Sequence, residues 1–354
     1  MFTFPFELPD EVHEPIAGEL ILDAPSPCDE ANRCYRYGWL ALRNGRRVEL
    51  VLTHSRATAQ FMYGMQQSAA DPYLFDLLGL AQRGVAPVAT WLAGQLILGA
   101  PRARIIGVAI RDALCSPAMQ EALSRYSQDA VVILPVLREG AKFQMGEGVY
   151  ETYGYYCDEA LLDSHHVYDP TVPRYNRRVE TTILKDQDIS PQQRAGKRLA
   201  LVGDSIASGV VMLGVLGHVQ RRFERVEQVE ILAPFVTLRG LARLAHYSPP
   251  AFRLRVHSFE TVLNALPPDY YYSAHYAEPE FHIRPDLEAQ YRAWWGSDAA
   301  GHSIADTACA GYGWAEAFFN PRKQIQMINE QLWVRHRLTI ADVVQRNLAG
   351  VNAA

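Results

Sequence analysis

The sequence lacks the features that mark several special classes of protein. Its five cysteines are scattered and include no Cys-x-x-Cys pair, so we expect free thiols in a reducing compartment. The apolar stretch from Val85 to Leu98 is interrupted by Pro87 and is too short to cross a bilayer. The first residues show neither the basic nor the apolar region of a signal peptide. We therefore expect a cytoplasmic protein with no membrane partner.

Positive charge is not in excess either. The chain has 34 Lys and Arg against 39 Asp and Glu, a formal net charge of -5, which argues against nucleic acid as a partner. Hydrophobic residues make up 49% and charged residues 21% of the 354, an ordinary globular composition that allows a sizeable core. This length permits one large domain or two.

Residues 1–103 are predicted to form an extension made of an arm, a hairpin and helices. Two apolar runs flank Asn44-Gly45, a pair that supplies the positive φ of a type I′ turn, so residues 37–52 are typical of a β-hairpin. Thr53 or Ser55 can cap the helix that follows. We expect His54, between them, to be a cap or surface residue rather than a ligand.

From about residue 104 the chain alternates between strand-like and helix-like segments. This pattern is typical of an α/β fold with a mostly parallel sheet and helices on both faces, and we assign it to residues 104–262. Strands are expected at 104–110, 130–137, 199–202, 228–236 and 252–257, and helices at 116–126, from 210 onward and at 237–246. Residues 263–354 are rich in aromatic side chains and are expected to form a C-terminal hood ending in a helix over 321–347.

The segment from Gly203 to Val210 follows a buried-strand pattern and precedes an apolar helix. Backbone N–H groups at a helix N-terminus favour an anion, and Gly209 permits a ligand to approach the backbone. Asp204 can accept hydrogen bonds from sugar hydroxyls or a metal-bound water. Three interpretations remain open: a structural turn, a ribose-5-phosphate loop, or a nucleophile turn built on Ser205.

A second candidate loop follows the strand at 130–137. Arg138 stands at its carboxyl end, where ligands bind in open α/β sheets, and arginine binds phosphate through two parallel hydrogen bonds. His165 and His166 do not indicate a metal site, because adjacent side chains of an extended chain point to opposite sides and no third ligand has zinc-like spacing. We expect these two histidines in an exposed loop.

Four segments follow one another at a spacing that carries a family resemblance. They are Leu134-Pro-Val-Leu-Arg-Glu-Gly-Ala141, Gly154-Tyr-Tyr-Cys-Asp-Glu-Ala-Leu-Leu162, Val179-Glu-Thr-Thr-Ile-Leu-Lys-Asp-Gln-Asp-Ile189 and Leu201-Val-Gly-Asp-Ser-Ile-Ala-Ser-Gly209. With the strand and helix over 233–244, they resemble the uracil phosphoribosyltransferases, a branch of the type I phosphoribosyltransferases. The chain departs from that family at Cys157, where the family has an arginine, and at Gly203, where it has an acid.

The resemblance implies an enzyme of nucleotide metabolism that transfers a phosphoribosyl group from phosphoribosyl pyrophosphate to a nucleobase-like or other small acceptor. It implies that Arg138 stabilises the leaving diphosphate, that Asp204 acts at the ribose, and that the donor carries Mg²⁺. Donor contacts are implied for Glu139, Gly140, Cys157, Asp158, Lys185, Gly203, Ser205, Ile206, Ala207, Ser208, Gly209 and Val210, and acceptor contacts for Gly311, Tyr312 and Gly313. Residues 155–189 are expected to close as a flap, and a homodimer is expected.

Two other functions compete with this one. Loss of an arginine from the diphosphate site removes charge-assisted bonds of roughly 1.5–3 kcal/mol each, so a non-catalytic protein that binds phosphoribosyl ligands is the main alternative. The other is a GDS-type serine hydrolase built on Ser205. That enzyme requires an Asp-x-x-His pair downstream, and Asp298 and His302 have the wrong spacing.

Overall fold

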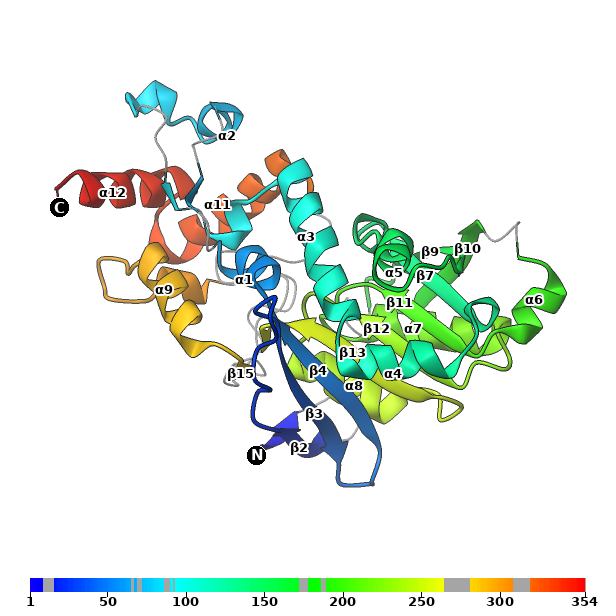
Figure 1. The fold of residues 1–354 in the computed structure, drawn as a ribbon. Coiled ribbons are helices and arrows are strands. Elements are labelled where there is room, and N and C mark those ends of the chain that lie inside the picture. The colour runs from blue at the N-terminus through cyan, green and yellow to red at the C-terminus, as the bar shows by residue number, and fades with distance from the viewer. Residues whose placement is uncertain are drawn as a thin grey trace. The chain divides into compact units, whose positions relative to one another are not determined.

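The computed structural model describes residues 1–8, 16–64, 67–68, 72–85, 90–91, 93–171, 178–185, 189–263, 281–307 and 319–353 (Figure 1). The chain forms two compact units. The first consists of Met1–Ser55 and Ile106–Ile283, and the second of Arg56–Ile105 and Arg284–Ala354. Within the described ranges, no helix is both long and apolar enough to cross a membrane.

The first unit is built on an eleven-stranded sheet (Figure 1). The strand order is β1 (Phe2–Leu8), β2 (Ile16–Leu22), β3 (Cys34–Leu42), β4 (Arg47–His54), β13 (Arg253–Phe259), β12 (Gln228–Leu232), β11 (Leu199–Gly203), β7 (Val131–Leu137), β9 (Leu161–His166) and β10 (Val179–Lys185). β8 (Asp158–Glu159) also pairs with β7. The strands from β4 to β9 in this order run parallel, whereas β1–β4 and the β9–β10 pair are antiparallel. The expected α/β architecture with a mostly parallel centre is therefore present.

Helices cover both faces of this sheet, as the alternation of the sequence predicts. On one face, Leu50 and Leu52 of β4 belong to the main hydrophobic core together with side chains of α7 (Val210–Arg222) and α8 (Leu238–Tyr247). Successive side chains of a strand point to opposite faces, so Val51 lies on the other face, in a cluster with Ala118 of α4 (Pro117–Arg125). Also in this unit are α5 (Met145–Tyr153), α6 (Pro191–Gly196) and the short pair β14 (Thr261–Val262) and β15 (Phe281–His282).

One predicted strand is a helix. Residues 104–110 lie within α3 (Gly99–Leu114), which crosses the boundary between the two units. Ile106, Ala109, Ile110 and Ala113 are fully buried, and their spacing of three and four residues is the period of a helix. A short apolar run does not by itself distinguish a buried strand from part of a helix, which explains the error.

The predicted hairpin is confirmed, but its turn is not type I′. Gly45 has φ of 83°, whereas Asn44 does not have positive φ, and a type I′ turn requires it at both positions. Because β4 pairs directly with β13, residues 1–55 belong to the sheet of the first unit. Of the predicted extension over residues 1–103, residues 1–55 thus lie in the first unit and residues 56–103 in the second.

The expectation of free thiols is wrong for two cysteines. Cys28 and Cys34 form a disulfide, with their Cα atoms 4.3 Å apart. The chain folds back before β3, because Ser26 N–H donates to the carbonyl of Tyr35 at 2.7 Å, and this brings the two cysteines together. Cys115 and Cys157 are free, and Cys309 lies outside the described residues.

The second unit is mainly helical. It contains α1 (Arg56–Tyr63), β5 (Gln67–Ser68), α2 (Pro72–Leu77), β6 (Thr90–Trp91), α9 (Pro285–Trp295), α11 (Pro321–His336) and α12 (Ile340–Ala353). The single final helix expected over 321–347 is two helices, because Arg337 takes a left-handed conformation with φ of 57°. Trp295 packs edge to face against Tyr291 and against Trp294 on α9. The predicted aromatic hood also includes residues 264–280 and 308–318, which lie outside the described ranges.

Candidate functional site

The two candidate loops leave the sheet at the same edge. β7 and β11 are parallel, and Gly203 at the end of β11 pairs with Pro135 of β7. The exposed Arg138, which follows a cis peptide bond after Leu137, therefore lies at the carboxyl edge together with the loop that begins at Asp204. This confirms the prediction that the two loops share one edge, the place where open α/β sheets bind ligands.

A hydrogen bond joins the two loops. Ser205 Oγ donates to Oε1 of Glu139 at 2.8 Å, and Ser205 N–H donates to Oδ1 of Asp204 at 3.0 Å. Burial raises the pKa of the Asp204 carboxyl well above its ordinary value, the negative charge of Glu139 raises it further, and the Ser205 N–H opposes part of this shift. The loops thus share a serine and two carboxyl groups that compete for ionisation.

In the Asp204 loop, some backbone N–H groups donate a hydrogen bond within the protein and others do not. Ile206 N–H donates to the carbonyl of Phe235 at 2.8 Å, so this donor and that of Ser205 are not available to a ligand. In the described part of the chain, nothing accepts a hydrogen bond from N–H of Ala207, Ser208 or Gly209. Of the residues 205–210 that the sequence predicts to bind an anion, residues 207–209 are therefore the ones whose N–H groups have no acceptor.

Glycines allow this loop to pack closely on α8. Gly209 has φ of 81° and forms the N-cap of α7. A Cβ on Gly240 of α8 would lie 2.6 Å from the carbonyl oxygen of Ala207, so no side chain fits there. The same oxygen accepts a hydrogen bond from Thr237 Oγ1, whose residue caps α8. The loop is thereby held between two helix N-termini.

Two predicted donor contacts lie elsewhere. Asp158 pairs with Val132 at the amino end of β7, about 20 Å along the strand from Arg138 at ~3.3 Å per residue. Its carboxylate binds Nζ of the fully buried Lys197 at 2.5 Å. Burial raises the pKa of the neighbouring Cys157 thiol to about 11, although the Lys197 charge opposes the shift. The structure does not bring Cys157 and Asp158 to the carboxyl edge.

The predicted flap over residues 155–189 contains the hairpin of β9 and β10, the last two strands in the order of the sheet. β9 and β10 are antiparallel, and β9 is in register with the carboxyl half of β7, so the last residues of β9 lie beyond the end of β7. His165 and His166 lie in β9 rather than in an exposed loop. Lys185 ends β10, and closure of the hairpin stays a prediction. The predicted acceptor contacts Gly311, Tyr312 and Gly313 lie outside the described residues.

Sequence reasoning missed an acid–imidazole pair on the same edge. His54 is the last residue of β4 and is 8% exposed, not a surface residue. Its Nδ1 lies 3.0 Å from both carboxylate oxygens of Glu260, which follows β13 and is fully buried. Because the partners are 206 positions apart, only the strand order β4–β13 brings them together.

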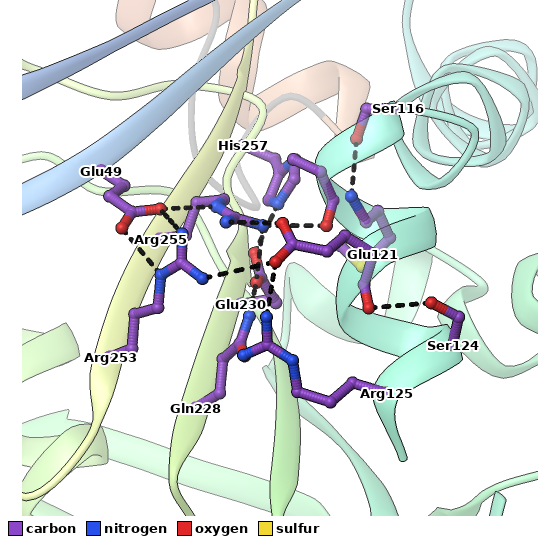
Figure 2. Close-up of polar contacts among 12 residues, drawn as sticks. Glu49, Ser116, Glu121, Ser124, Arg125, Gln228, Glu230, Arg253, Arg255 and His257 are labelled. Carbon is purple, nitrogen blue, oxygen red and sulfur yellow. Dashed lines mark hydrogen bonds and ion pairs between the residues drawn. The ribbon is translucent and has the colours of Figure 1, made fainter. Parts of the chain in front are cut away.

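A buried polar cluster also lies on the sheet face covered by α4, as Figure 2 shows. Glu230 of β12 binds His257 Nε2 at 2.6 Å and Arg255 Nη1 at 3.2 Å, and all three side chains are buried. Arg255 also donates to Glu49 and to the carbonyl of Ala118. Burial disfavours ionisation of Glu49, but hydrogen bonds and charge from Arg253 and Arg255 outweigh it and lower its pKa. The cluster lies between strand and helix, away from the loops.

The described residues contain no group of three or more His, Cys, Asp or Glu side chains that could hold a metal ion. The Asp204–Glu139 pair supplies carboxylate oxygens of the kind that Mg²⁺ prefers, and a bound cation would relieve the repulsion between them. The donor set fits a Mg²⁺ ion that arrives with a ligand.

No family model and no curated protein matches this chain. Solved structures are similar at low identity. A hypoxanthine phosphoribosyltransferase from Staphylococcus aureus is 16% identical, with a TM-score of 0.30, over 51% of this chain and 90% of its own. A hypoxanthine phosphoribosyl transferase from Trypanosoma cruzi is 12% identical, with a TM-score of 0.31, over 54% and 93%. A hypothetical protein from Neisseria gonorrhoeae with bound ppGpp is 13% identical, with a TM-score of 0.29, over 44% and 80%. Similarity at this level assigns no family.

Proposed function

We propose that this chain is a phosphoribosyltransferase-type enzyme. It uses phosphoribosyl pyrophosphate and Mg²⁺ and transfers the phosphoribosyl group to a nucleobase-like or other small acceptor, with release of diphosphate. The observation that carries the proposal is the 2.8 Å hydrogen bond between Ser205 and Glu139, because it joins the two candidate loops side by side at the carboxyl edge of adjacent parallel strands, where open α/β sheets bind ligands.

The two loops suit the two charged ends of such a donor. The unsatisfied N–H groups of Ala207, Ser208 and Gly209, at the positive end of the α7 dipole, bind the 5-phosphate. Arg138, in the loop that follows the neighbouring strand β7, binds the diphosphate and stabilises the charge that develops as it leaves. Donor-borne Mg²⁺ supplies further neutralisation of that charge when bound.

Asp204 lies between these two ends. Because its pKa is raised, the carboxyl group keeps its proton to higher pH than an exposed aspartate. In its neutral form it can both donate to and accept from ribose hydroxyls. In its ionised form it stabilises positive charge at the ribose carbon as the bond to diphosphate breaks. The same residue thus orients the donor and acts during the reaction.

The hydrolase alternative has less support than the transferase. The Ser205 hydroxyl donates to a carboxylate, and among the described side chains no histidine accepts a hydrogen bond from it. A serine nucleophile requires such a base within hydrogen-bond reach. Cys157 stands where the resembled family has an arginine, but it lies at the amino end of the sheet and not beside Arg138. The cysteine is therefore no argument against catalysis at the carboxyl edge.

The experiment combines calorimetric titration of phosphoribosyl pyrophosphate and Mg²⁺ with single-turnover release of diphosphate, using uracil, hypoxanthine, adenine and orotate as acceptors. Arg138→Ala should lower turnover by roughly 10²–10³, the scale for one preorganised donor, and donor affinity by less. Arg198→Ala is the control, because Arg198 is a partly exposed arginine at the amino end of β11. Tight donor binding without release by the wild type would favour the non-catalytic alternative.

A further inference from the structure

In the pair formed by His54 and Glu260, the carboxylate fixes the orientation of the imidazole ring. Glu260 is fixed at both sides of its backbone: its N–H donates to the carbonyl of Thr53 at 3.0 Å, and its carbonyl accepts from Ile283 N–H at 2.8 Å. Glu260 also has φ of 59°, a conformation that non-glycine residues rarely adopt. The carboxylate is therefore held in place, and its two oxygens at 3.0 Å keep the His54 proton on Nδ1.

The other ring nitrogen of His54 is available. Within the described ranges no group hydrogen-bonds to its Nε2. The residue as a whole keeps 8% of its surface exposed. His257 provides the contrast: its Nε2 is bound to Glu230, and its Nδ1 is completely buried without a partner. Of these two acid–imidazole pairs, the one at the carboxyl edge presents a basic nitrogen to a ligand.

The position of His54 fits an acceptor rather than the donor. Along the sheet, β7 with Arg138 lies on one side of β11, while β12, β13 and β4 with His54 lie on the other. Three strand spacings separate β4 from β11, which is about 14 Å. In a displacement at a ribose carbon, the incoming atom and the leaving group lie on opposite sides of that carbon. With the diphosphate at Arg138, the acceptor enters from the side of His54.

We infer that His54 is the general base that deprotonates the acceptor and that Glu260 is its positioning residue. This inference rests on the proposed function. The acceptor N–H or O–H attacks the ribose carbon, the new bond forms with the acceptor's electron pair, and the old carbon–oxygen bond breaks with its pair leaving on diphosphate. The acceptor proton passes to Nε2 of His54. The resulting imidazolium is stabilised by the Glu260 carboxylate at Nδ1 and later loses the proton to water.

The test uses three variants of the full chain. His54→Asn keeps a donor near the position of Nδ1 for Glu260 but removes Nε2. Glu260→Gln keeps the imidazole but removes the charge that orients it. His257→Gln is the matched control, since it removes a buried histidine that also pairs with a glutamate. For each protein, donor affinity and the single-turnover rate of diphosphate release are measured between pH 5 and 9 with the same four acceptors.

The expected result separates a catalytic from a structural role. His54→Asn should lower the rate by roughly 10²–10⁴, the usual contribution of a general base, and should abolish the fall in rate at low pH, with donor affinity unchanged. Glu260→Gln should shift that pH limb, and His257→Gln should retain it. If His54→Asn keeps the wild-type rate and pH profile while the wild type is active, this inference is wrong and the proposed function stands. If the wild type binds no donor or releases no diphosphate, both are wrong.

A labelling experiment checks the accessibility of Nε2 without any turnover. Diethyl pyrocarbonate acylates unprotonated, accessible imidazole nitrogens, and mass spectrometry of peptides locates the modified residue. His54 should be modified and His257 should not. Modification of His257 with His54 unreacted would overturn the assignment of His54 as the available base.

Discussion

Gly140 and Gly203 touch backbone to backbone: a Cβ built on Gly140 would lie 2.1 Å from the carbonyl oxygen of Gly203. A Cβ on Gly203 would instead lie 2.6 Å from Cε of Met145, the end of a flexible side chain that can move. The close approach of the two loops therefore depends on the absence of a side chain at Gly140. This contact sets the spacing between the loop that contains Arg138 and the loop at Asp204.

Gly140→Ala should consequently disturb both stability and binding. The nearest atom belongs to the backbone and cannot rotate away, so we expect the free energy of unfolding to fall by about 1–3 kcal/mol, as in other overpacked sites. Donor affinity should fall with it. Urea unfolding and calorimetry provide the two measurements. Gly196→Ala is the control, since a Cβ there meets nothing within 4 Å; equal losses in both variants would contradict the contact.

Asp204→Asn should change how stability depends on pH. Because the pKa of Asp204 is higher in the folded than in the unfolded state, the folded protein binds more protons, and stability falls as pH rises above about 4 toward the folded pKa. Removing the carboxyl removes this loss. The Asp204→Asn variant is therefore expected to gain melting temperature relative to wild type at pH 7 more than at pH 4.

Asp286→Asn should change the pH dependence of stability in the opposite direction and serves as the comparison. A hydrogen bond from Arg284 lowers the pKa of Asp286, so this group stabilises the fold above its unfolded pKa and loses that effect as pH falls. The variant should lose more melting temperature at pH 7 than at pH 4. Parallel pH profiles for the two variants would mean that the Asp204 carboxyl is not shifted upward.

Glu230→Gln should be strongly destabilising. The substitution leaves Arg255 and His257 buried without their shared carboxylate, and breaking a buried ion pair from one side costs about 3–5 kcal/mol. Arg178→Ala removes an exposed ion pair with Glu180 and should cost no more than about 1 kcal/mol. Urea unfolding of the two variants measures the difference. A cost for Glu230→Gln as small as that for Arg178→Ala would show that water reaches the cluster.

Asp158→Asn tests whether Asp158 stabilises the fold by pairing with Lys197, as in the structure, or binds the donor, as the sequence predicts. Without the carboxylate, the buried Lys197 keeps only the carbonyl oxygens of Asp129 and Val131, so we expect a loss of about 1–3 kcal/mol in stability. Affinity for phosphoribosyl pyrophosphate and Mg²⁺ should not change. A large fall in donor affinity without a change in stability would show that Asp158 contributes to donor binding.

The loop at Asp204 could be predicted from sequence because its determinants are local. An apolar run predicts β11, small residues predict the loop, and a second apolar run predicts α7, all within one short segment. The same holds for the hairpin around Gly45. In contrast, the strand predicted at 104–110 is wrong, since the helical spacing of its buried residues becomes visible only over the longer stretch of α3.

Contacts between distant segments could not be predicted in this way. Gln228, Glu230 and Arg255 are polar side chains on strands, where such residues normally face water, and only the cover provided by α4 buries them. His54 and Glu260 meet because β4 and β13 are neighbours, a pairing that neither strand's own sequence specifies. Motif order likewise does not reveal that Asp158 lies at the amino end of β7.

The division of the chain has a consequence for its synthesis. The second unit begins at Arg56 and resumes only at Arg284, with the larger part of the first unit translated in between. At ribosomal rates of about 5–20 residues per second, roughly ten seconds or more pass between the synthesis of its early helices and that of the helices from residue 284 onward. During that interval the buried side chains of α1, Phe61 and Met62 among them, lack the later half of their unit. Chaperone contact during translation should therefore concentrate on residues 56–105.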